Sequence, residues 1–316
     1  MIKKIAGYIA MFLISAVIVV TAFACYLYFS AYSPEKTEAV NDIKNGVAQN
    51  SLNSTVRLLS FNTGYGSLSQ NHDFNDLRAD SAKEVIANTA AISEIVRLSG
   101  ADIIALQEVD INSKRSYFLN QREIYGEVLP YSTAFCYKSR AEFNLKYLGK
   151  LNTGLFVAAK AEILNAQRIS VSENNGLFKK INGEQNGVLV TNFKVEGFEK
   201  ELSLINANIK KEEVDTLIKM ANEQEIMGRA VIMCISLKGE KKEVEKSFED
   251  SGYKVSSDDA DTERSLLKPY VKGENKTFIS DFFVYSKNIN LSHIETVDGE
   301  FRFSNHNPII AEFKFE

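Results

Sequence analysis

Residues 102–108 read Asp102-Ile103-Ile104-Ala105-Leu106-Gln107-Glu108, and this stretch decides the fold. An unbroken apolar run of this kind is typical of a strand whose two faces are both buried. An amide and a carboxylate follow the apolar residues directly. The stretch therefore predicts a central strand with polar side chains at its carboxyl end.

Strands dominate the chain on both sides of this stretch. Thr55–Asn62 is rich in β-formers, and a helix is expected to begin at Ser81, where Glu84 completes a capping box, and to end at Gly100. A second helix is expected over 211–228. Further strands are expected over 154–159, 187–195, 201–208, 230–237, 278–285 and 308–315. Because the helices fall singly between strands, we expect sheets packed face to face with helices outside.

The composition excludes several classes of protein. With 45% hydrophobic and 25% charged residues among 316, the chain has enough apolar side chains to form a core, so disorder over most of its length is excluded. A net charge of -4 disfavours broad nucleic-acid binding, because no strong positive field would gather polyanions. Cys136 and Cys234 could pair outside the cell, but two unpaired core thiols are the favoured interpretation. A three-histidine metal site would need every histidine of the chain: His72, His293 and His306.

The N-terminal segment predicts a membrane anchor. Residues 5–32 carry no charged side chain. This uncharged run is longer than the roughly 20 apolar residues needed to cross the hydrocarbon layer. Lys3 and Lys4 precede the run and predict a cytoplasmic N-terminus with the rest of the chain extracellular. A cleaved signal peptide is the alternative, with Ala22-Phe23-Ala24 as the cleavage site. An uncleaved anchor is favoured, because the apolar run continues beyond that site.

Three parts of the chain follow from these patterns. Residues 1–32 form the single-pass anchor in the cell membrane, and residues 33–54 are polar, of mixed charge, and predict a tether. Residues 55–316 form one large domain, a length that is normal for layered α/β architectures.

Polar residues recur at the ends of the expected strands. Asn62, Glu108 and Asn208 each end a strand, Asp281 interrupts an apolar strand, and Asn305-His306 precedes the last strand. A buried carboxylate such as that of Asp281 is costly unless it is paired, although polar residues at strand ends are more often structural than functional. Together they suggest one common polar end, the kind of place where metal-assisted phosphate chemistry is assembled.

Four segments, in this order, resemble the endonuclease/exonuclease/phosphatase superfamily of DNase-I-like phosphoesterases. Residues 57–62 resemble its first strand, which ends in a site asparagine, and 102–109 resemble its metal-binding glutamate strand. Residues 279–284 resemble its buried aspartate strand, and 304–309 resemble its terminal Ser-Asp-His-x-Pro signature. The resemblance covers nearly all of 55–316. It implies an α/β fold, a four-layered sandwich of two mixed sheets flanked by helices, and Mg²⁺-dependent phosphoester hydrolysis.

The resemblance also implies roles for residues that this chain retains. It implies Mg²⁺ binding by Glu108 and a catalytic position for Asn62. Asp281 and His306 match the superfamily's aspartate–histidine pair.

Four matched positions depart from the superfamily pattern. The usual Asn-x-His reads Asn206-Ala207-Asn208, so Asn208 stands where a histidine is expected. Ser236 and Lys238 stand where an Asp-x-Asn is expected, and Asn305 replaces the aspartate of the terminal signature. Loss of the acids removes the water-activating base and part of the metal's ligand set, and Glu108 alone would hold Mg²⁺ weakly.

Three functions remain open on the sequence. The favoured one is a membrane-anchored, catalytically degenerate domain (a pseudoenzyme) that binds a phosphorylated small molecule, a lipid headgroup or a protein partner. The alternative is an active, divalent-metal-dependent phosphodiesterase or phosphatase with a rearranged site. The third is a structural surface domain without a ligand. The first is favoured because amides and cations can hold a phosphate without cleaving it. The expected phosphate-binding residues are Asn62, Asn208, Lys238 and His306.

Overall fold

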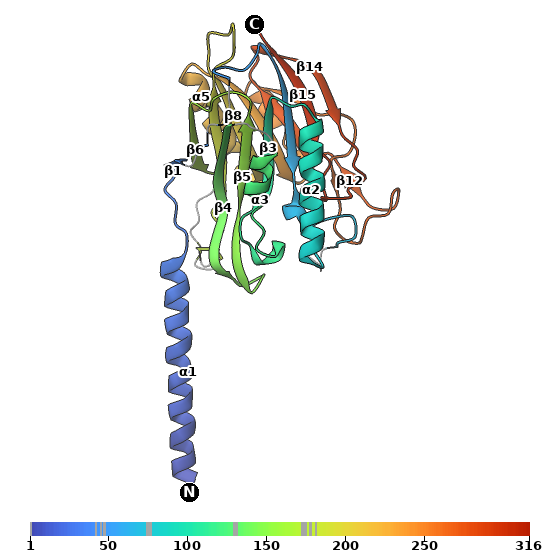
Figure 1. The fold of residues 1–316 in the computed structure, drawn as a ribbon. Helices are drawn as coiled ribbons and strands as arrows, with labels where there is room; N and C mark the ends of the chain where they lie inside the picture. Colours follow the sequence, from blue (N-terminus) through green and yellow to red (C-terminus); the bar gives the residue numbers. More distant parts are fainter. Residues whose placement is uncertain are drawn as a thin grey trace.

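The computed structural model describes residues 2–41, 43, 44, 46, 49–73, 78–128, 132–171, 176, 179, 180 and 182–316. One helix, α1 (Ile2–Ser30), projects from the remainder, which is layered (Figure 1). Residues Lys4–Ser30 are long and apolar enough to cross a membrane, by length and composition, and their most apolar window is 0% buried. The expected N-terminal apolar helix is therefore present.

Two mixed sheets form the centre of the domain. The six-stranded sheet has the order β14 (Ile289–Thr296), β15 (Ile309–Phe315), β2 (Thr55–Asn62), β3 (Ile103–Asp110), β5 (Gly149–Ala159) and β4 (Ser132–Asn144). The seven-stranded sheet has the order β1 (Thr37–Ala39), β6 (Asn165–Ser170), β7 (Gly187–Phe193), β8 (Leu202–Lys210), β9 (Ala230–Lys238), β13 (Asp281–Tyr285) and β10 (Lys254–Ser256). A two-stranded ribbon, β11 (Glu263–Arg264) with β12 (Thr277–Phe278), lies outside both sheets.

Helices cover the outer face of each sheet (Figure 1). On the six-stranded sheet these are α2 (Ala82–Leu98) and α3 (Gln121–Glu127); on the seven-stranded sheet they are α5 (Val214–Ile226) and α6 (Glu245–Asp250). Short 3-10 turns complete the elements: η1 (Gly64–Gly66), η2 (Lys114–Ser116), η3 (Lys211–Glu213) and η4 (Lys241–Glu243). The predicted four-layered sandwich is confirmed.

The core explains why the layers pack. Between the sheets, apolar side chains of both sheets share one cluster, in which Ile103 and Leu204 are 0% exposed. On the outer faces, Ile92 of α2 and Leu217 of α5 are equally buried against their own sheets. Strands buried on both faces need apolar residues in succession, which is the pattern of β3 and β9.

Local signals in the sequence set several element boundaries. The side chain of Ser81 accepts the backbone N–H of Glu84 at 3.2 Å and caps α2 as predicted. The stretch predicted as one strand over 278–285 is divided, because Thr262 Oγ1 accepts the backbone N–H groups of Ser280 and Asp281. β12 therefore ends before β13 begins.

The segment 33–54, predicted as a polar tether, lies against the sandwich in its described residues. β1 pairs with β6 in antiparallel register, and Leu52 forms a bridge with Val195 while remaining 1% exposed. These described parts of the connection between α1 and the domain are therefore paired with the sheet. Cys136 and Cys234 are buried and unpaired.

Candidate functional site

The centre of each sheet holds a pair of parallel strands, β2 with β3 and β8 with β9. The carboxyl ends of these four strands, together with the start of β13, meet at one end of the sandwich, which we call the polar end. Gln107 Nε2 donates to Asn206 Oδ1 at 2.8 Å and joins the two sheets there. Asn206 in turn donates to the backbone oxygen of Leu106 at 2.9 Å, so both amides are fixed by the opposite sheet.

Asn62 and Ser236 lie together at the polar end. Asn62 Nδ2 donates to Ser236 Oγ at 3.0 Å, and both side chains are buried. Asn62 Oδ1 accepts the backbone N–H of Gly64, and Ser304 Oγ donates to the backbone oxygen of Asn62 at 2.8 Å. The end of β2 is thereby bonded to β9 through Ser236, and the segment before β15 is bonded to the end of β2 through Ser304.

Glu108 reaches the site through an irregularity in β3. The register between β3 and β5 shifts between Leu106 and Val109, and Glu108 has a φ of 57°. Such a bulge redirects one side chain. A glutamate with a left-handed backbone conformation is strained, and the surrounding structure offsets that conformational free energy. Glu108 Oε1 accepts a hydrogen bond from Asn208 Nδ2 at 3.2 Å.

The charges of two lysines act on the carboxylate of Glu108. Lys138 on β4 donates to both the backbone oxygen and Oδ1 of Asn208. Burial, reinforced by the positive charge of Lys238, lowers the pKa of Lys138 to about 7. Burial alone would raise the pKa of Glu108, but Lys238, His306 and a hydrogen bond from Tyr65 outweigh it and hold that pKa below its usual value. Glu108 is therefore ionised at neutral pH and balanced by ammonium groups.

These surroundings do not fit a divalent cation at Glu108. Mg²⁺ takes oxygen ligands and commonly one or two carboxylates. Within the described part of the chain, no group of three or more histidine, cysteine, aspartate and glutamate side chains is arranged to hold a metal. The groups that contact Glu108 or act on its charge are an amide N–H, a phenol, the imidazole of His306 and two lysine side chains.

Asp281 and His306 form the predicted buried pair. His306 Nδ1 lies 2.7 Å from Asp281 Oδ2, which also accepts from Ser280 Oγ at 2.9 Å. His306 Nε2 lies 3.7 Å from Glu263 Oε1. Burial would lower the pKa of His306, but the charges of Asp281 and Glu263 raise it to about 9. Burial raises the pKa of Glu263 to about 7.

Asn305 lies beside the turn that follows β2. A Cβ placed on Gly64, whose φ is +53°, would come within 2.9 Å of Asn305 Oδ1, so this turn needs a glycine. Asn305 Oδ1, Asp281 Oδ1 and Glu263 Oε2 are buried acceptors without a hydrogen-bond partner among the described residues. The polar end thus offers acceptors on the His306 side and ammonium donors on the Glu108 side.

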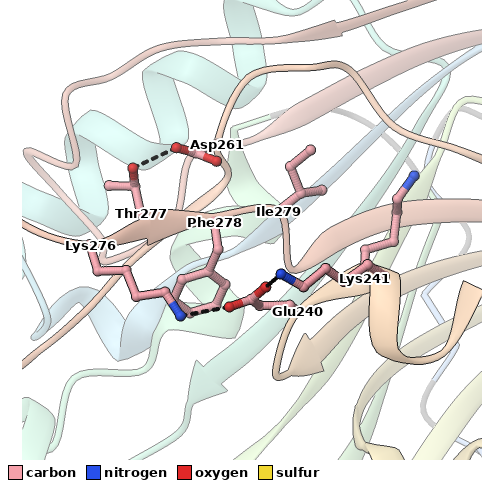
Figure 2. Close-up of a pocket in the computed structure, with 8 residues that line it drawn as sticks. Glu240, Lys241, Asp261, Lys276, Thr277, Phe278 and Ile279 are labelled. Atoms are coloured by element: carbon pink, nitrogen blue, oxygen red, sulfur yellow. Dashed lines mark hydrogen bonds and ion pairs between the residues drawn. The ribbon is translucent and has the colours of Figure 1, made fainter.

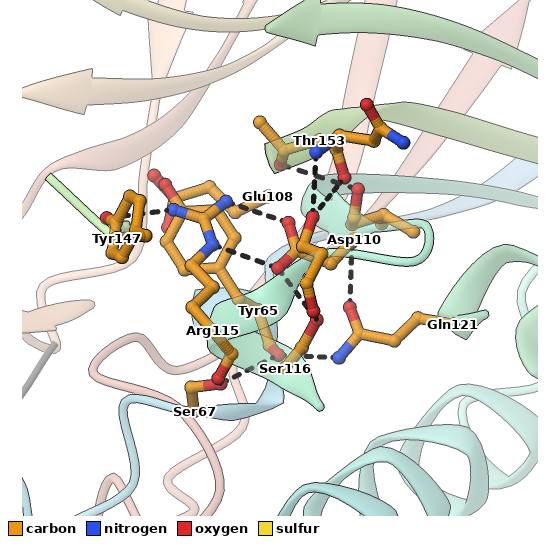
Figure 3. Close-up of polar contacts among 12 residues, drawn as sticks. Tyr65, Ser67, Glu108, Asp110, Arg115, Ser116, Gln121, Tyr147 and Thr153 are labelled. Carbon is orange, nitrogen blue, oxygen red and sulfur yellow. Dashed lines mark hydrogen bonds and ion pairs between the residues drawn. The ribbon is translucent and has the colours of Figure 1, made fainter. Parts of the chain in front are cut away.

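A buried arginine supports the Glu108 side (Figure 3). Arg115 donates to both carboxylate oxygens of Asp110, at 2.9 and 2.7 Å, and lies 3.1 Å from the centre of the Tyr65 ring. Arg115 is 3% exposed, so it belongs to the core of this end rather than to a solvated loop. It positions Tyr65, whose hydroxyl hydrogen-bonds Glu108.

A groove of about 430 Å³ flanks the polar end, next to the loop after β9 (Figure 2). Lys241 donates its backbone N–H to the oxygen of Ile279, which ties that loop to the segment before β13. Inside the groove, Glu240 pairs with Lys276 at 2.6 Å and with Lys242 at 2.5 Å. The charges of Glu240, Lys242 and Lys276 in the groove thus compensate one another, and the groove forms a rim beside the polar end.

All eight residues that the sequence singled out lie at the polar end; their functional roles stay predictions. Three neighbours were missed: Tyr65, Lys138 and Glu263. A lysine within Phe135-Cys136-Tyr137-Lys138-Ser139 could have been recognised as a cation on a largely buried strand. Glu263 gave no signal, because it lies in a short polar segment that only the fold brings to His306.

The four-layered sandwich is similar to solved structures of endonuclease/exonuclease/phosphatase superfamily proteins. A superfamily protein structure from Bacteroides vulgatus matches at 16% identity, with a TM-score of 0.58 over 83% of this chain and 99% of that one. One from Leptotrichia buccalis matches at 12% identity, with a TM-score of 0.58 over 82% and 100%. The human Nocturnin catalytic domain with bound sulfate anion matches at 15% identity, with a TM-score of 0.56 over 87% and 97%. No protein-family model and no curated protein sequence matches the chain.

Proposed function

We propose that this chain is a membrane-anchored binding protein that holds a phosphorylated ligand at its polar end and has lost metal-dependent hydrolysis. One observation carries the proposal: Lys138 Nζ donates to Asn208 Oδ1, and the amide of Asn208 donates to the carboxylate of Glu108, where the superfamily resemblance implies a divalent cation. The α1 helix supplies the anchor, with its N-terminus on the cytoplasmic side. Protease added to intact cells should therefore digest the domain, and complete protection would reverse the orientation.

Anion binding follows from the donors at this end. Lys238 and the protonated His306 are cationic, Lys138 becomes cationic below its pKa of about 7, and the amide of Asn62 adds an uncharged donor. Hydrogen bonds from charged donors to phosphate oxygens are roughly twice as strong as neutral ones. The Nocturnin domain of the same fold holds a sulfate anion, which supports the use of a tetrahedral anion as a probe.

Sulfate is the sharpest probe, because it stays a dianion over the whole working pH range. The full chain in detergent should be stabilised against heat by sulfate, following RT ln(1 + [L]/Kd). Lys138→Met and Lys238→Met should each weaken binding by about tenfold or more, as expected for a charged hydrogen bond. Lys200→Met is the matched control, because that lysine is exposed and precedes β8, at the end of the strand opposite to the polar end.

The pH profile gives a second test. Because the pKa of Lys138 is about 7 in the free protein, sulfate binding above pH 7 requires proton uptake, and affinity should fall as pH rises. The Lys138→Met variant should lose this step. Wild-type sulfate affinity in Lys138→Met, or no sulfate binding by the wild type, would contradict the proposal.

An active phosphoesterase is the second candidate, and the His306 side favours it. The Asp281–His306 pair is intact, and the pKa of the neighbouring Glu263 is raised to about 7, near the range suited to general acid–base work. Hydrolysis of a simple phosphodiester with Mg²⁺ or Mn²⁺ separates the two. If the wild type hydrolyses the phosphodiester and Glu108→Ala does not, the chain is an active phosphoesterase and the proposal of a binding protein without hydrolysis is wrong.

A further inference from the structure

The β4–β5 hairpin projects beyond the polar end of the sandwich. β5 pairs with β3 from Ala159, opposite Ile103, to Thr153, opposite Asp110. The beginning of β5 and the end of β4 therefore extend past the point at which β3 ends. We call residues 142–150 the hairpin tip; Figure 1 shows it projecting to the side on which α1 leaves the domain.

The hairpin also runs alongside α1. Tyr137 on β4 stacks edge-on with Tyr32, with ring centres 6.1 Å apart, and Phe143 stacks with Phe23 at 5.8 Å. β4 and the N-terminal segment thus run in opposite directions: the residue of β4 nearer the tip, Phe143, contacts the residue nearer the N-terminus, Phe23 of the apolar helix. The guanidinium of Arg140 lies between these contacts, 5.9 Å from the Tyr32 ring.

Helix length places the membrane boundary near these contacts. Lys4–Ser30 contains 27 residues, about 40 Å of helix, whereas the hydrocarbon layer is about 30 Å thick. Starting at Lys4, roughly 20 residues fill the layer, so its far boundary falls near Phe23. Aromatic side chains are enriched at such boundaries, and they cluster here: Phe23, Tyr26, Tyr28, Phe29 and Tyr32.

The chemistry of the hairpin tip fits that boundary. Leu145 is 43% and Leu148 63% exposed, although both are large and apolar. Lys146 and Lys150 stand beside them, with Glu142 as the acidic residue of the tip. Apolar side chains among lysines are the pattern of segments that lie at the interface of a bilayer.

We propose that the hairpin tip enters the interfacial layer of the bilayer that α1 crosses, and so holds the polar end facing phospholipid headgroups. This inference rests on the proposed function for the anchor and for the phosphate chemistry of the polar end. It adds the source of the ligand: the phosphate is carried by a membrane lipid beside α1. The bilayer, rather than a protein, is the partner because the contacts of the tip continue directly into the membrane helix.

The absence of tryptophan from the chain makes the test direct. Leu148→Trp and, as a second variant, Leu145→Trp each place a single reporter in the tip. Ile226→Trp is the matched control: Ile226 is 84% exposed at the end of α5, near the start of β9, whose other end carries Lys238. The full chain is placed in discs of phosphatidylcholine and phosphatidylglycerol whose acyl chains are brominated close to the headgroup or left unbrominated.

Tip tryptophans should lose most of their emission in brominated discs and emit at shorter wavelength, whereas Ile226→Trp should be unaffected. Equal emission of both tip variants in brominated and unbrominated discs would overturn the inference. If the chain co-purifies with discs and binds sulfate, that result sinks the tip contact alone. A chain that does not co-purify with discs would refute the anchor, and with it this inference.

Discussion

The two sides of the polar end balance their carboxylates in different ways. On one side, Asp281 is paired with the imidazolium of His306 at 2.7 Å. On the other, Glu108 is held by an amide and by the nearby charges of Lys138 and Lys238. The same sandwich supports both arrangements, which shows that a fold does not decide the chemistry of its site. On our proposal, the first side is retained for stability and the second has exchanged a metal for lysines.

Removal of Asp281 should have the largest effect on stability. Asp281→Ala leaves the buried His306 cation without its partner, and breaking such a pair costs about 3–5 kcal/mol. The melting temperature should fall clearly, measured by circular dichroism on the full chain. Asp250→Ala, an exposed aspartate at the end of α6, is the control and should change little. An unchanged melting curve for Asp281→Ala would show that the pair contributes nothing.

Rebuilding the Glu108 side should create activity. Asn208→His, Ser236→Asp, Lys238→Asn and Asn305→Asp together should give Mg²⁺-dependent phosphodiester hydrolysis about 10²-fold or more above the wild type, the scale of general acid–base assistance. Single changes should do little, because such groups act as a unit. A Mg²⁺-dependent rise in melting temperature should accompany the activity. A folded quadruple variant with neither property would show that more than these four groups is missing.

The pH dependence of stability should isolate His306. Its pKa is about 9 in the folded chain and near 6.5 when unfolded, so the folded state binds the proton more tightly. The resulting stabilisation, up to about 3 kcal/mol, is fully present below pH 6.5 and is lost as pH rises through 9. Denaturant titrations of wild type and His306→Asn should converge over that window. His293→Asn, which alters a histidine 49% exposed on β14, should keep the wild-type profile.

Neutralising Glu108 should have the smallest effect, and in the opposite direction. Glu108→Gln removes a negative charge that repels an anion; because that charge also raises the pKa of Lys138, binding is compared well below pH 7, where Lys138 keeps its proton. Sulfate should bind about tenfold more tightly, equal to about 1.4 kcal/mol, measured by calorimetry. Glu94→Gln on the exposed face of α2 serves as the control. Weaker sulfate binding by Glu108→Gln would show that Glu108 organises the site instead of opposing the anion.

The sequence by itself determined the layers. The apolar run of Ile103–Leu106 and the Ser81 cap act over a few residues, so local physics sets them, and the structure has both. The apolar run of α1 is equally local. Strands with alternating or mixed polarity, such as β6 and β14, were not predicted, because their pairing depends on neighbours distant in the chain.

Only the tertiary structure decided how the polar end is balanced. Glu263 meets His306 from a ribbon outside both sheets, and Lys138 meets Asn208 across 70 positions of the sequence. Such neighbours leave no trace in local periodicity, because burial and opposing charge are properties of the assembled layers. The same holds for Thr37–Ala39, which lies in the segment predicted as a polar tether and pairs with β6. The charge balance of the polar end thus arises from packing, whereas the layers follow from the pattern of apolar residues.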